Sequence, residues 1–107
     1  MTIAVIYARV SSKAQLKKGD GLGSQESRCR DFATYRGYEV VRVFHERGVT
    51  GRIEDRPAMR EMLTWLRKNR KDTPVVIIDD ISRLARNLEV HLKLRATIGS
   101  VGAQLES

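Results

Sequence analysis

The chain has 107 residues, a length typical of one compact domain with a single hydrophobic core. Apolar residues make up 41% of it and charged residues 31%, and no apolar run approaches the roughly 20 residues of a membrane-spanning helix. A net charge of +7 favours polyanionic partners such as nucleic acid, although ribosomal and membrane-surface proteins share it. The single cysteine, Cys29, cannot form an internal disulfide and fits a small buried residue in a reducing cytoplasm.

The first third of the chain predicts a strand, a loop and a helix. Residues 3–7 (IAVIY) form an apolar, branched run typical of a strand buried on both faces, and the polar stretch 11–23 predicts a loop. Ser24 is suited to cap a helix that runs to about Arg36 and stops at Gly37. The inner face of this helix would carry Cys29, Phe32 and Ala33.

The middle of the chain predicts a second strand and a second helix. Residues 38–46 (YEVVRVFHE) have the β-branched and aromatic content of a strand, and residues 47–56 predict a loop. Pro57 suits the first turn of a helix that ends in the basic run 67–71, which we interpret as a solvated helix end. Its apolar face, at the spacing i, i+3, i+4, i+7, consists of Met59, Met62, Leu63 and Leu66.

The last third predicts a strand at 74–78, a loop at 79–87, a further helix and a fourth strand at 103–106. The apolar positions of that helix are Val90, Leu94, Ile98 and Val101. Strands that alternate with helices predict an α/β fold: a mostly parallel central sheet of about four strands with helices on both faces.

Three polar segments follow the first three strands, at 9–15, 46–56 and 79–87. Ligands bind outside the carboxyl ends of strands in an open parallel sheet, so we expect these segments to form the functional site. They contribute Arg9, Arg52, Arg56, Arg83 and Arg86. Clustered guanidinium groups repel one another unless they surround an anion, and the planar fork of Arg matches two phosphate oxygens.

Ser11 is the candidate nucleophile, because it lies just past the first strand and two residues beyond Arg9. No histidine stands in a Ser-His-Asp pattern, and we interpret His45 and His91 as structural or exposed. A serine among arginines favours phosphoryl transfer over acyl transfer, since the main task there is to stabilise charge on phosphorus.

Two alternatives remain open at this stage. Asp79 and Asp80 follow an apolar strand and could hold Mg²⁺ in a metal-dependent nuclease or phosphotransferase, although a P-loop motif (GxxxxGK[ST]) is absent. The same two acids could instead form salt bridges with nearby arginines or cap the following turn. The chain could also be a basic binding module without catalytic activity.

Several motifs, taken in order, resemble the serine recombinase family of resolvases, invertases, and large serine integrases and transposases. Residues 7–11 (YARVS) resemble its nucleophile motif YxRVS, and residues 46–51 (ERGVTG) resemble its DxGxSG loop, with Glu46 and Thr50 as substitutions. Residues 81–86 (ISRLAR) resemble LDRLxR, with Ser82 in place of the usual Asp. Asp79 or Asp80 could compensate for that lost carboxylate, or no base is required there. The remaining matches are Gln15, Gln25 and Arg56.

The resemblance implies metal-free, cofactor-free recombination of double-stranded DNA through a 5′-phosphoserine intermediate formed by Ser11. It implies that Arg9, Arg83 and Arg86 bind the scissile phosphate, with Arg56 assisting. Gln15, Gln25 and Thr50 would position groups by hydrogen bonding. It further implies homodimers that assemble into a tetramer, no small-molecule substrate, and a bacterial or phage-type protein near the nucleoid. Residues 1–107 would be the catalytic domain of a longer protein with a long helix and a DNA-binding region, more similar to the large serine recombinases.

Overall fold

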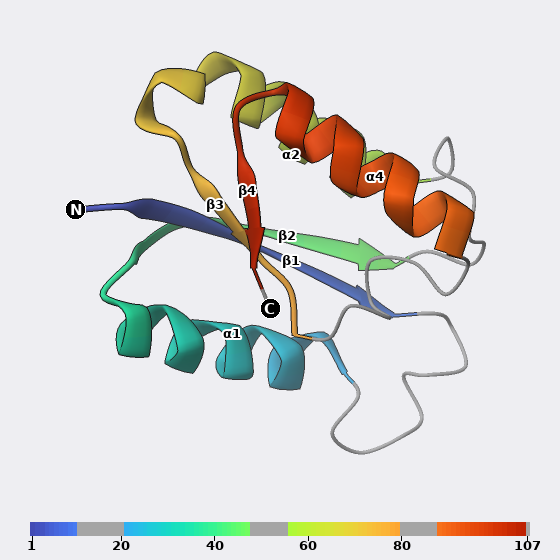
Figure 1. The fold of residues 1–107 in the computed structure, drawn as a ribbon. Coiled ribbons are helices and arrows are strands. Elements are labelled where there is room, and N and C mark those ends of the chain that lie inside the picture. The colour runs from blue at the N-terminus through green and yellow to red at the C-terminus, as the bar shows by residue number, and fades with distance from the viewer. Residues whose placement is uncertain (11–20, 48–55, 80–87, 107) are drawn as a thin grey trace.

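The computed structural model describes residues 1–10, 21–47, 56–79 and 88–106. Their elements in chain order are β1 (Ile3–Val10), α1 (Leu22–Arg36), β2 (Glu39–Arg47), α2 (Pro57–Lys68), the short 3-10 helix η3 (Arg70–Asp72), β3 (Val75–Ile77), α4 (Leu88–Ser100) and β4 (Gln104–Glu106). The strands form one parallel sheet in the order β2-β1-β3-β4. Helix α1 covers one face, and α2 and α4 cover the other (Figure 1). The predicted fold class is confirmed.

The central strand β1 is buried on both faces, as its uninterrupted apolar run predicts. Side chains of a strand point alternately to the two faces. Val5 and Tyr7 therefore pack with α2 and α4, whereas Ala4 and Ile6 pack with α1. Both faces thus hold a hydrophobic core, and the polar carboxyl ends of the strands are left at one edge of the sheet.

Helix α1 begins earlier than the sequence predicts. Its N-cap is Gly21 and no side chain caps it, so the prediction that Ser24 caps this helix is wrong. Leu22 is buried against Ala8 of β1, and this apolar contact fixes the first turn in place of a cap. The predicted stop is confirmed, because Gly37 has a left-handed φ of 76° and its N–H donates to the carbonyl of Thr34.

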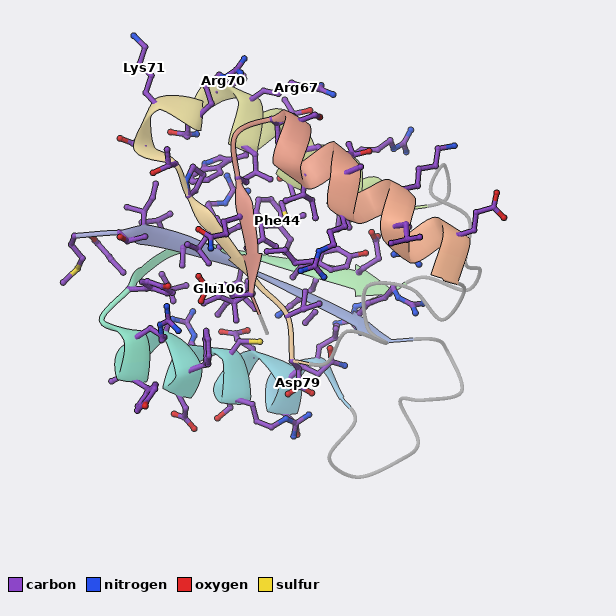
Figure 2. All side chains as sticks on the ribbon, viewed as in Figure 1. Phe44, Arg67, Arg70, Lys71, Asp79 and Glu106 are labelled. Carbon is purple, nitrogen blue, oxygen red and sulfur yellow. The ribbon has the colours of Figure 1, made fainter. Side chains whose placement is uncertain are left out.

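Helix α2 begins at Pro57 and buries its predicted apolar face of Met59, Met62, Leu63 and Leu66, so both predictions are confirmed. The basic run after it is exposed, and Figure 2 shows Arg67, Arg70 and Lys71 at the outer end of α2 and in η3. In α4, Ile98 is buried as predicted; the side chains of Val90 and Leu94 lie outside the described residues. Most of each predicted loop at 11–23, 47–56 and 79–87 also lies outside them, but Leu22 and Gly23 belong to α1 and Arg47 belongs to β2. No helix in the described ranges is both long and apolar enough to cross a bilayer.

Candidate active site

The carboxyl ends of three strands meet at one edge of the sheet, as the sequence predicts. Strands β1 and β2 run parallel, and their register places Arg9 opposite Glu46. Strand β3 runs parallel to β1 on its other side. Of the predicted site residues the structure describes Arg9, Gln25 and Arg56. The others lie outside the described residues: Ser11, Gln15, Thr50, Arg52, Arg83 and Arg86.

Gln25 holds the end of the strand that precedes Ser11. Its Oε1 accepts the backbone N–H of Arg9 at 3.2 Å, and its Nε2 donates to the Arg9 carbonyl at 3.0 Å. The side chain is fully buried in the first turn of α1, so the amide replaces the water that this stretch of backbone would otherwise bind. Gln25 is therefore a structural clamp on β1, and the guanidinium of Arg9 extends from the clamped residue.

A buried carboxylate, Glu46, joins β1, β2 and α2. Its Oε1 accepts from the hydroxyl of Tyr7 at 3.1 Å and from the N–H of Met59 at 3.0 Å, while Oε2 accepts from the N–H of Ala58 at 3.1 Å. The carboxylate thus caps the amino end of α2, where free N–H groups and the helix dipole favour negative charge. This contact was not predicted from the sequence. One available signal was that Arg56, the N-cap residue, belongs to no good capping type.

Arg56, the residue directly before α2, is fully buried, although the sequence places it in a polar loop. Burial, together with the nearby charge of Glu46, raises the pKa of Tyr7 above its ordinary value of 10.0. The positive charges of Arg56 and Arg9 act on the same phenol in the opposite direction. Both arginines therefore lie within electrostatic range of Tyr7, and their convergence on one phosphate stays a prediction. A contact of either with DNA remains a prediction.

Asp79 is engaged by Arg28 in a bidentate ion pair. Arg28 Nε lies 2.7 Å from Oδ1 of Asp79, and its second terminal nitrogen lies 2.8 Å from Oδ2. Because both carboxylate oxygens already accept from a cation, the salt-bridge interpretation of Asp79 is favoured over a Mg²⁺ ligand or a free base. Among the described residues there is no cluster of three or more His, Cys, Asp or Glu that could hold a metal ion. Asp80 lies outside the described residues.

His45 and Cys29 have no catalytic setting. His45 is partly exposed at the surface of β2, and its Nε2 lies 2.9 Å from Oε1 of Glu26. Cys29 is buried between α1 and the sheet, and burial raises the pKa of its thiol to about 12. A thiol with so high a pKa is a poor nucleophile. The predictions that His45 is structural or exposed and that Cys29 is a buried apolar residue are confirmed; the His91 side chain is outside the described residues.

The model of the family described as "Resolvase, N terminal domain" matches residues 4–107. The C-terminal catalytic domain of ISC1926 TnpA, an IS607-like serine recombinase, is 32% identical with a TM-score of 0.76, over 96% of this chain and 67% of that one. The N-terminal catalytic domain of TP901-1 integrase is 25% identical with a TM-score of 0.84, over 99% and 77%.

A resolvase family site-specific recombinase from Streptococcus pneumoniae is 25% identical with a TM-score of 0.77, over 98% of this chain and 70% of that one. No curated protein sequence is similar enough to count as a match. The family match spans nearly all of the sequence, and the structural similarity extends over the same range. The chain therefore belongs to the resolvase N-terminal domain family and has the fold of serine recombinase catalytic domains.

Proposed function

We propose that this chain carries out the strand cleavage and rejoining of site-specific DNA recombination, with Ser11 as the nucleophile. The observation that carries the proposal is the clamp of Gln25 on Arg9, in a chain of this family. It fixes the backbone two residues before Ser11 at the carboxyl edge of a parallel sheet, where ligands bind.

The reaction is two successive transesterifications. The hydroxyl oxygen of Ser11 attacks the phosphorus of a DNA phosphodiester, and the 3′-oxygen leaves and takes up a proton. A 5′-phosphoserine link and a free 3′-hydroxyl result. After the half-sites exchange, the 3′-hydroxyl attacks the phosphoserine, and the serine hydroxyl is restored. The number of phosphate esters is unchanged, so no nucleotide is required as an energy source. The proposed reaction also uses no metal ion or other cofactor.

The arginines supply the electrostatic part of catalysis. Arg9, Arg83 and Arg86 bind the scissile phosphate and stabilise the charge that develops on it, since their forks match pairs of phosphate oxygens. Arg56 is fully buried, so it assists through its positive charge at the start of α2 and not by direct contact with DNA. Gln15, Gln25 and Thr50 position groups by hydrogen bonding, and the clamp supplies one such contact for Gln25.

The partner is double-stranded DNA, and no small molecule is the substrate. We propose that the chain is the catalytic domain of a longer protein whose homodimers assemble into a tetramer on two DNA sites. The longer protein works in the cytoplasm of a bacterium or on phage DNA, at the nucleoid, and is most similar in kind to the large serine recombinases.

The test is a trapping assay with the full-length protein. A DNA site that is nicked, so that cleavage cannot reverse, is incubated with wild type or Ser11→Ala in EDTA. A denaturant-resistant protein–DNA adduct that is absent in Ser11→Ala supports the proposal. An adduct that persists in Ser11→Ala moves the nucleophile elsewhere, with Ser12 as the first candidate. Plain cleavage that appears only with Mg²⁺ would instead favour a nuclease built on Asp79 and Asp80, and binding without any cleavage would favour a binding module.

A further inference from the structure

The amino-terminal half of α1 contacts the carboxyl ends of two strands. Gln25 binds the backbone of Arg9 at the end of β1, and Arg28 binds Asp79 just beyond the end of β3. Residues three apart on a helix lie next to each other on one face, so a single patch of α1 makes both contacts. Figure 2 shows Asp79 beside this part of the helix.

The geometry of the second contact fixes orientation as well as distance. Two nitrogens of Arg28 meet two oxygens of Asp79, at 2.7 and 2.8 Å, in the parallel arrangement of a guanidinium on a carboxylate. The preceding residue, Ile78, donates its backbone N–H to the carbonyl of Glu106 in β4 at 3.0 Å. The end of β3 is therefore held from the neighbouring strand and, through Asp79, from α1.

The two strand ends lead into the two halves of the proposed machinery. Ser11 follows Arg9 by two residues, and Arg83 follows Asp79 by four. The direction in which the chain leaves the end of a strand determines where the residues directly after it lie. Because α1 holds both strand ends, it sets the relative positions from which the segments that carry Ser11 and Arg83 begin.

We propose that Arg28 and Asp79 are positioning residues for strand cleavage: their ion pair aligns the exit of β3 with the clamped exit of β1 through α1. This inference rests on the proposed function. The side chain of Arg28 is 46% exposed and that of Asp79 is 14% exposed, so solvent partly screens the pair and it contributes only modestly to folding. A loss of cleavage much larger than the accompanying loss of stability is therefore its signature.

The experiment compares Arg28→Lys and Asp79→Asn with wild type in the full-length protein. Lys keeps the charge but loses the fork, and Asn keeps the shape but loses the charge. At saturating DNA, the rate of adduct formation should fall on the order of tenfold to a hundredfold, because small misplacements of reacting groups slow a reaction by such factors. The Kd for DNA should stay at the wild-type value, and the midpoint of thermal unfolding should fall by no more than about 5 °C. The double variant should be no slower than the slower single variant, because the two residues act as one unit.

Arg30→Lys is the matched control. Arg30 lies on the same helix and forms an ion pair with Glu26 at 2.8 Å, four residues away. Glu26 also contacts His45 of β2, but this edge strand leads to neither Ser11 nor Arg83. The Arg30→Lys protein should cleave DNA at the wild-type rate. Wild-type rates in Arg28→Lys and Asp79→Asn, or an equal loss in Arg30→Lys, would overturn the inference, as would losses that track a lowered unfolding midpoint. If wild type itself forms no adduct, the proposed function fails first, and the ion pair then has no cleavage step to position.

Discussion

The hydroxyl of Tyr7 donates to Oε1 of Glu46 across 39 residues of sequence, inside the core. The same carboxylate accepts two backbone N–H groups of α2, from Ala58 and Met59. One side chain therefore ties the strand of the proposed nucleophile, its neighbour and the helix that follows Arg56. The proposed site is built on this buried junction, and the contribution of Glu46 to folding stability can be measured.

Replacement of Glu46 by Gln should destabilise the fold by about 2 kcal/mol, because the amide can accept at only one atom and turns N–H groups toward the donors of α2. Tyr7→Phe should cost only about 1 kcal/mol, since it removes one hydrogen bond and keeps the ring in the core. Urea denaturation of the two variants measures both values. If Glu46→Gln loses no more stability than Tyr7→Phe, the contacts of Glu46 with the amino end of α2 contribute nothing beyond its contact with Tyr7.

The contribution of Tyr7 should depend on pH in the alkaline range. Burial raises the pKa of Tyr7 in the folded chain above its ordinary value of 10.0, so the folded state holds this proton more tightly than the unfolded state. The resulting stability is fully present below pH 10 and declines as the pH rises above it, where the phenol of the unfolded chain ionises. The difference in stability between wild type and Tyr7→Phe, measured from about pH 9 to about pH 11, should shift against wild type. A difference that is constant over this range would contradict the prediction.

Replacement of Gln25 should affect both the fold and cleavage. Gln25→Met keeps the volume but leaves the N–H and carbonyl of Arg9 without this partner, at a cost of about 2 kcal/mol for two partly buried hydrogen bonds. Adduct formation by the full-length variant should also slow, below the temperature at which it unfolds, since the backbone before Ser11 is released. Ser27→Ala, an exposed change on the same helix, is the control. Cleavage at the wild-type rate by folded Gln25→Met would show that the hydrogen bonds of Gln25 to Arg9 are not needed for cleavage.

Cys29 should resist thiol reagents in the native chain. Its thiol is 1% exposed, and burial raises its pKa to about 12, so little thiolate forms near neutral pH. Alkylation should be slow in buffer and fast in urea, as measured by mass spectrometry over time. DNA cleavage should survive treatment with the reagent under native conditions. Rapid native alkylation would mean that α1 opens from the sheet more readily than its packing implies.

Helix and strand positions followed closely from local patterns. The branched run at 3–7, the helical spacing of Met59 to Leu66, and Gly37 as a stop each specify an element within a few residues of sequence. The start of α1 did not, because the contact of Leu22 with Ala8 outweighs the capping preference of Ser24. That contact depends on how the helix docks on the sheet, and no local pattern reports it.

The sequence alone determined the family, through the order of its motifs, and the parallel α/β class, through the alternation of strands and helices. Both motif spacing and periodicity are properties of the chain itself. Only the tertiary structure decided what the polar residues contact. Gln25 meets Arg9 over 16 residues and Arg28 meets Asp79 over 51, and both depend on strand register and helix docking. Polar side chains at the same strand ends can pair in many ways that have similar local free energies. The packing of α1 and α2 on the two faces of the sheet selects among these pairings, because buried polar groups must find partners there.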